Sequence, residues 1–98
     1  MGMKAAELAA LLKDKNIFYV NIEEPDSKGS TIETIIEDLK GIICSVEADT
    51  ITFKGTAKTA YFTILENTQI LTHQTEECEI ISTFAENGGI QIKRKKKI

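Results

Sequence analysis

The stretch Gly41–Phe53, which reads GIICSVEADTITF, alternates between apolar and polar residues. Ile42, Cys44 and Val46 fall on one face of an extended chain, because successive side chains of a strand point to opposite faces. A period of two is typical of a half-buried β-strand. The alternation resumes after a tight turn at residues 48–50. The stretch therefore predicts a sheet built from short antiparallel strands.

The same alternation continues toward the C-terminus. It predicts further strands over residues 51–53, 60–65, 69–75, 78–84 and 90–92. Glu66–Thr68 is expected to form a hairpin loop, and Asn87–Gly89 carries a strong hairpin signal. In the strand over residues 78–84, one side holds Cys78, Ile80, Ser82 and Phe84, which we expect to be its apolar face. Strands joined by short turns pair antiparallel, so we expect a meander.

Two segments upstream have helical periodicity. Residues 3–13 and residues 30–40 each place apolar side chains at i, i+3, i+4 and i+7. The second segment has the clearer stripe, formed by Ile32, Ile35, Ile36 and Leu39. Ser30 and Glu33 have the spacing of a capping box, and Gly41 is placed to end the helix. A strand over residues 17–22 and a loop over residues 23–29 are expected between the two helices.

These elements predict an α+β fold. Two N-terminal helices pack on one face of a five- to six-stranded, mainly antiparallel meander sheet, because the helices do not alternate with the strands. The 98 residues are enough for one domain, over residues 1–98, with a basic tail at residues 93–98. No apolar run approaches the roughly 20 residues of a membrane helix.

Charge is distributed unevenly along the chain. Residues 1–92 hold 7 basic and 15 acidic side chains, a formal charge of −8, whereas the last six residues hold 5 basic ones. An acidic body favours a cationic partner and repels nucleic acid. We expect the partner to be another protein, for example a basic surface of a nucleic-acid-processing enzyme. The candidate binding residues are Glu23, Glu24, Asp26, Glu33, Glu37, Asp38, Glu76, Glu77 and Glu79.

The polybasic end supports a different function. A run of this kind binds phosphate backbones through charge alone, so a nucleic-acid binder is one alternative. The run has no aromatic side chain on which a base could stack. We expect it to be a solvated terminus. It consists of Lys93, Arg94, Lys95, Lys96 and Lys97.

His73 is the only histidine, and histidine is the commonest general acid or base. A site at His73, for a small ligand or for a minor enzymatic activity with Cys44, Cys78 or a carboxylate, is the other alternative. The two cysteines lack the close spacing of a structural zinc site, and we expect them to pack in the core. No phosphate-binding glycine motif or dinucleotide fingerprint is present in the sequence.

The sequence thus favours a small acidic, non-catalytic binding module that regulates or inhibits another protein, with no metal and no cofactor. Two unlinked cysteines and no signal peptide indicate a cytoplasmic protein. Ile70, Leu71 and Ile81 are apolar residues that a single buried face does not need. We therefore expect a homodimer, formed through the helix-free face or an edge of the sheet.

Overall fold

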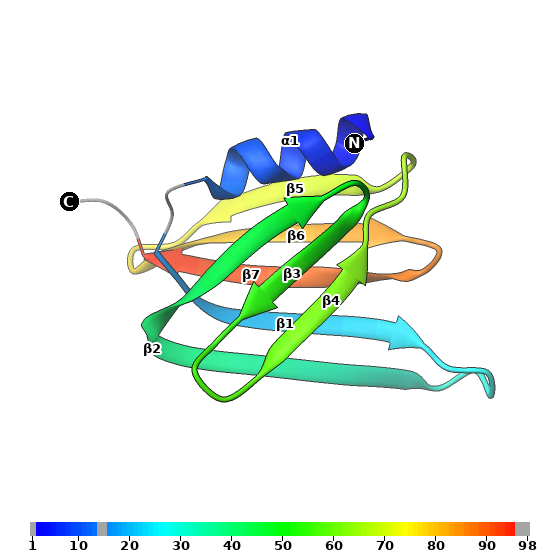
Figure 1. Cartoon of the computed structure of the whole chain (residues 1–98), viewed down its shortest axis with the longest axis horizontal. Coiled ribbons are helices and arrows are strands. Elements are labelled where there is room, and N and C mark those ends of the chain that lie inside the picture. The colour runs from blue at the N-terminus through cyan, green and yellow to red at the C-terminus, as the bar shows by residue number, and fades with distance from the viewer. Residues whose placement is uncertain (1, 14–15, 96–98) are drawn as a thin grey trace.

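A computed structural model describes residues 2–13 and 16–95. One helix, α1 (Met3–Leu12), precedes one antiparallel sheet of seven strands with the order β4-β3-β2-β1-β7-β6-β5 (Figure 1). The strands are β1 (Ile17–Pro25), β2 (Thr31–Glu47), β3 (Thr50–Lys54), β4 (Thr59–Thr63), β5 (Gln69–Gln74), β6 (Cys78–Ala85) and β7 (Gly88–Lys95). The expected fold class was therefore wrong: the protein is mostly sheet, with one short helix rather than two and seven strands rather than five or six.

The expected second helix is the first half of β2. Residues 31–37 pair antiparallel with β1, and a turn over residues 26–30 joins the two strands. The helical stripe is a coincidence of spacing, since Ile36 is buried whereas Ile32 and Leu39 are 53% and 83% exposed. β-Branched threonines and isoleucines also favour a strand. Within the strand, pairing with β1 places Ile36 in the core.

β2 is long because it belongs to two layers. Residues 31–37 pair with β1, whereas residues 43–47 pair with β3. Gly41 lies between these parts with a φ of 110°, a conformation that suits glycine. The end of β2, together with β3 and β4, crosses over the layer of β1, β7, β6 and β5 (Figure 1).

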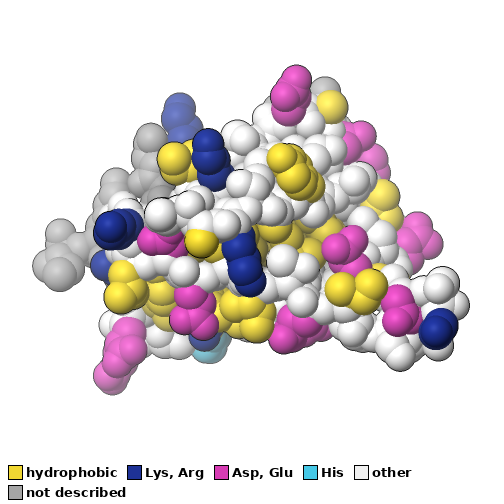
Figure 2. All heavy atoms as spheres, turned by 60° about the horizontal axis from the view of Figure 1, so that its bottom comes forward, with side chains coloured by type: hydrophobic (Ala, Val, Ile, Leu, Met, Phe, Trp, Pro, Cys, Tyr) yellow, Lys and Arg dark blue, Asp and Glu magenta, His cyan; other side chains and the backbone are white. Residues whose placement is uncertain are grey.

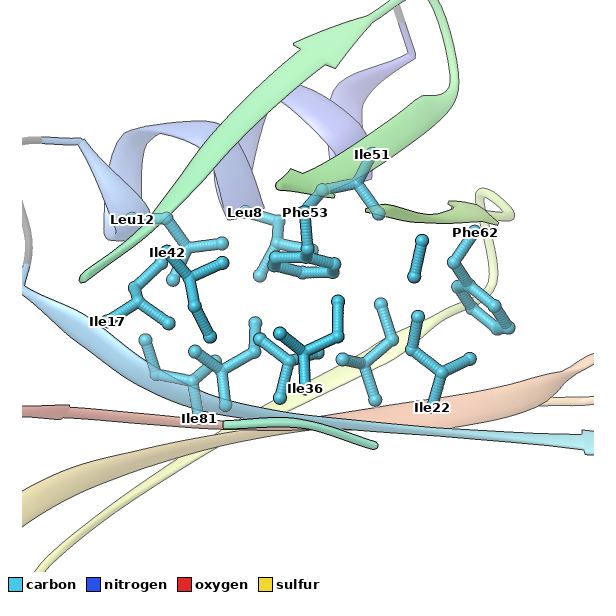
Figure 3. Packing of buried hydrophobic residues seen from close by; sticks show 14 of the residues in the cluster. Leu8, Leu12, Ile17, Ile22, Ile36, Ile42, Ile51, Phe53, Phe62 and Ile81 are labelled. Atoms are coloured by element: carbon cyan, nitrogen blue, oxygen red, sulfur yellow. The ribbon is translucent and has the colours of Figure 1, made fainter. Parts of the chain in front are cut away.

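The core lies between the two layers and is covered by α1. Leu8 from α1 and Phe53 from β3 are fully buried and point toward Ile81 of the other layer (Figure 3). The expected first helix and the inward faces of the strands at residues 42–46, 51–53 and 60–64 are confirmed. The buried hydrophobic residues are Ala5, Leu8, Leu12, Ile17, Val20, Ile22, Ile36, Ile42, Ile51, Phe53, Ala60, Phe62, Ile64, Ile81, Ile90 and Ile92.

The two faces of β6 are the reverse of those expected. Ile81 and Thr83 are buried, whereas Phe84 is 53% exposed on the outer face. Both alternations in β6 contain apolar residues, so the periodicity alone did not distinguish them. Ile81 is therefore a core residue and not a spare apolar side chain available to a dimer.

The turn after β2 is confirmed, the β6–β7 hairpin turns one residue earlier than expected, and one expected hairpin is wrong. Tight turns join β2 to β3 at Ala48–Asp49 and β6 to β7 at Glu86–Asn87. Residues 64–68 are instead a connection between the layers, because β4 and β5 lie at opposite edges of the sheet. The chain is therefore not a simple meander, since β7 returns to pair with β1.

Half of the expected tail is part of the sheet. β7 extends to Lys95, and Arg94 is only 8% exposed. The guanidinium group of Arg94 forms an ion pair with Glu79 and donates a hydrogen bond to the carbonyl oxygen of Leu11. Arg94 is therefore a structural residue that joins α1, β6 and β7. Lys96 and Lys97 lie outside the described residues.

Candidate functional site

A groove of about 460 Å³ lies between the ends of two hairpins. One wall comes from the β1–β2 hairpin and the other from the β6–β7 hairpin. The pairing of β1 with β7 ends at Glu23 and Gly89, but β1 continues to Pro25. The lining residues are Asn21, Glu23, Glu24, Pro25, Thr31, residues 82–86 and residues 88–91.

The two glycines at the start of β7 lie where a side chain would clash with neighbouring backbone. Gly88 has a φ of +113°, and a Cβ atom added to it would lie 2.0 Å from the carbonyl oxygen of Glu23. Gly89 is paired with Phe84 on one side and with Glu23 on the other. Gly89 has no room for a side chain either, because a Cβ atom added to it would lie 2.2 Å from the carbonyl oxygen of Thr83.

The groove is acidic and partly aromatic. Glu23, Glu24 and Glu86 line it and are exposed, and none of the lining residues is a lysine, an arginine or a histidine. Phe84 presents a half-exposed ring beside these carboxylates. Because carboxylates attract a cation and the face of an aromatic ring does the same, the groove is suited to a positively charged group.

Asn21 connects the groove with the neighbouring strand. Its Nδ2 donates a hydrogen bond to Oε2 of Glu33 at 3.2 Å. Its Oδ1 is buried and has no hydrogen-bond partner among the described residues. Glu33 lies opposite Glu23 in the β1–β2 pairing, so three of the acidic residues proposed from the sequence, Glu23, Glu24 and Glu33, gather here.

Three other acidic candidates hold the fold together. Asp26 accepts hydrogen bonds from the backbone N–H groups of Lys28 and Ser30, which shapes the β1–β2 turn. Glu79 is occupied by Arg94. Asp38 anchors the β3–β4 loop at Thr56, as described next.

Asp38 accepts hydrogen bonds from the hydroxyl of Thr56 at 2.6 Å and from its backbone N–H at 2.7 Å. A third comes from the backbone N–H of Lys40 at 2.9 Å. These bonds, that from the Thr56 hydroxyl foremost, hold the pKa of Asp38 below the usual 3.8, because they favour the charged carboxylate. Asp38 is thus an ionised anchor for the loop.

The remaining acidic candidates lie elsewhere. Glu37 is opposite Tyr19, whose ring carries the ammonium group of Lys93 at 4.7 Å from its centroid. Glu76 and Glu77 form the β5–β6 turn, at the opposite end of β6 from the groove. On the side drawn in Figure 2, acidic side chains are spread among hydrophobic and basic ones rather than gathered in one patch.

His73 is exposed on β5, opposite Ile80, and does not line the groove. The register makes Cys78 its diagonal neighbour, but the Sγ atom of Cys78 contacts Oγ1 of Thr75 at 3.6 Å. Cys44 packs against the core, and its burial raises the pKa of the thiol to about 11. The Cys44 thiol is therefore protonated at neutral pH and is a poor nucleophile.

Comparisons with known proteins return no match: no protein-family model, no curated protein and no solved structure resembles the chain. Within residues 2–13 and 16–95, no helix has the length and hydrophobicity needed to cross a bilayer. The same residues contain no group of three or more histidine, cysteine or acidic side chains that could hold a metal ion.

Sequence reasoning missed three parts of the groove. Phe84 was expected to face inward, and Glu86 was not among the candidate acidic residues. The glycines at 88 and 89 were identified only as a turn signal. The signal in the sequence was a turn with two adjacent glycines and a flanking acidic residue. The groove itself forms only because β7 pairs with β1.

Proposed function

We propose that this chain is a non-catalytic binding module whose groove receives a basic side chain of a partner protein. The supporting observation is the lining, which includes Glu23, Glu24, Glu86 and a half-exposed Phe84 but no lysine, arginine or histidine. A guanidinium group can stack on the ring while its N–H groups donate to the carboxylates. Arginine is therefore preferred to lysine as the bound side chain.

The energetics favour a weak but selective contact. Each exposed ion pair contributes about 0.2–1 kcal/mol, and an exposed cation–π contact about 0.5–1 kcal/mol. A single arginine in the groove is thus insufficient for tight binding. A partner protein would add contacts with the half-exposed Phe84 and with Glu33, which is next to the groove.

The proposed partner is a protein with a clustered basic surface, such as the nucleic-acid channel of an enzyme. Occupying such a channel with carboxylates would inhibit it or regulate it, because the carboxylates replace phosphates as the counter-charge. We propose the cytoplasm as the place of action, where the free thiols of Cys44 and Cys78 stay reduced.

The test is a titration of ¹⁵N-labelled protein with a short acetylated peptide that contains two arginines and a leucine. We expect amide shifts at Phe84, Gly88 and Gly89 that weaken as the salt concentration rises. The triple variant Glu23→Gln, Glu24→Gln, Glu86→Gln should lose them. The matched control is Glu76→Gln with Glu77→Gln, which removes two exposed carboxylates from the opposite end of β6.

The proposal fails if the shifts map away from the groove, or if the control variant weakens binding as much as the triple variant does. A peptide with glutamates in place of the arginines should produce no shifts. Binding of both peptides with equal affinity would show that charge does not select the ligand.

A further inference from the structure

β5 is an edge of the sheet with an open side. It pairs with β6 from Gln69 to Gln74, and no other strand pairs with it among the described residues. All of its residues are exposed except the half-buried Ile70, which packs against the core. The open side is therefore accessible along its length.

The hydrogen-bond pattern shows which backbone groups of β5 are free. The N–H of Thr75 donates to the carbonyl oxygen of Cys78 at 2.9 Å, so these residues form a hydrogen-bonded pair next to the strand. In an antiparallel ladder such pairs alternate with non-hydrogen-bonded ones. Leu71 and His73 therefore bond to β6, whereas the N–H and C=O groups of Ile70, Thr72 and Gln74 point away from the sheet.

β5 lacks the protections that charged side chains, proline or a bulge give to an edge strand. It contains no Lys, Arg, Asp, Glu or Pro, and its register with β6 is regular, without a bulge. The opposite edge differs, since Lys58 precedes β4 and the side chain of Asn87 donates to the carbonyl oxygen of Thr63 at 2.9 Å. The two edges of the sheet are thus not equivalent, since the β4 edge is occupied in part by Asn87.

We propose that β5 pairs antiparallel with β5 of a second copy, about a two-fold axis at Thr72, so that the two sheets become one. In this register Thr72 lies opposite Thr72 of the second copy and Ile70 lies opposite Gln74. All three residues with free backbone groups are then hydrogen-bonded, and each side chain keeps its face of the sheet.

The choice of a second copy rests on self-complementarity. The paired segment contains no lysine, arginine, aspartate or glutamate, so two copies do not repel each other along the strand. Leu71, which is 57% exposed, lies beside His73 of the second copy. The contact is isologous and therefore closes after two chains.

Sedimentation velocity over a micromolar concentration series tests the association. Thr72→Pro removes an N–H that makes no bond within the chain, and edge strands tolerate proline. Losing both central hydrogen bonds should raise the dissociation constant about thirtyfold. Thr72→Lys keeps the N–H but brings two ammonium groups together at the axis, and should also yield monomers with an unchanged circular dichroism spectrum.

The control is Tyr61→Pro on β4. The bonds from Ile64 N to Asp49 O and from Gly55 N to Lys58 O show that the Tyr61 N–H also points to an open edge. This variant therefore introduces the same change at the other edge, and it should dimerise as the wild type does.

Amide exchange and an inter-chain NMR contact test the register of the β5–β5 pairing. Amide exchange at Ile70, Thr72 and Gln74 should slow as the protein concentration rises, whereas that at Leu71 and His73 should be slow throughout. In a mixture of labelled and unlabelled chains, an Hα–Hα contact between Leu71 and His73 is expected across the axis.

Three outcomes would overturn the proposal. One is a single-chain mass at every concentration. Another is a dimer that Thr72→Pro and Thr72→Lys leave intact. The third is association that Tyr61→Pro also abolishes, which would mean that β4 pairs with β5 and that the chains form rings or filaments. The triple groove variant should leave the dimer intact, so this test is independent of the proposed binding function.

Discussion

Gly88 is the residue on which the groove depends most directly. Its φ of +113° lies in a region that side chains rarely adopt, and the place of a Cβ atom is occupied by the backbone of Glu23. Two separate physical effects, backbone strain and a clash with an element that cannot move aside, therefore require glycine here. A local turn rule predicts only the positive φ of Gly88. The clash with Glu23 depends on a strand that is distant in the sequence.

Gly88→Ala should destabilise the protein by more than about 3 kcal/mol, because the clash adds to the strain of about 1–3 kcal/mol. The matched control is Gly29→Ala. Gly29 also has a positive φ, of 83°, but no atom lies within 4 Å of the added Cβ, so about 1–2 kcal/mol is expected. Urea unfolding of both variants measures the difference, and equal losses would show that Gly88 is not packed against β1.

At the scale of elements, the first half of β2 is a strand although its apolar residues have helical spacing. This half has a helical stripe, a capping box and a terminal glycine, yet it is a strand paired with β1 over residues 31–37. Only one residue of the stripe, Ile36, is buried. The expected helix and the observed strand therefore place different side chains in the core, so substitutions in residues 31–40 distinguish them.

Ile36→Ala should cost about 3 kcal/mol, as is typical for emptying a core position. Leu39→Ala should change the stability by less than about 0.5 kcal/mol, because Leu39 is 83% exposed. A helix packed on the sheet would bury both residues and make both substitutions costly. Chemical denaturation of the two variants separates these cases, and a large loss in Leu39→Ala would contradict the strand.

At the scale of the whole molecule, Arg94 connects the two ends of the chain. Its side chain bonds to the carbonyl oxygen of Leu11 at the end of α1 and to the carboxylate of Glu79 on β6. Both members of the ion pair are largely buried, at 10% and 16% side-chain exposure. Removing one member leaves a poorly solvated charge, which is the costly case for such pairs.

A chain that ends at Ile92 should therefore be destabilised by about 3 kcal/mol or more, because it loses Arg94 and part of the pairing of β7 with β1. A chain that ends at Lys95 keeps both and serves as the control. Thermal unfolding followed by circular dichroism compares them. Equal melting temperatures would restore the interpretation of residues 93–95 as a solvated tail.

The sequence by itself determined the features that depend on near neighbours. The alternation in residues 42–46, 51–53 and 60–64 placed the correct side chains in the core. The turn residues at 48–50 and the hairpin signal at Asn87–Gly89 identified two hairpins, the second of which turns at Glu86–Asn87. The helix over residues 3–12 followed from its apolar spacing. A local sequence pattern is sufficient to predict a strand or a turn where the residues allow only one buried face or one turn position.

Tertiary structure decided the rest, because the choices involve groups far apart in the chain. Residues 31–37 are a strand that pairs with β1, and Ile81 of β6 points inward although the other face of β6 also carries apolar residues. The groove exists only where β1 meets β7, across more than sixty residues of sequence, as the pairing of Glu23 with Gly89 shows. Its acidic lining was anticipated in part at Glu23 and Glu24, but its shape follows from a long-range strand pairing that no local periodicity encodes.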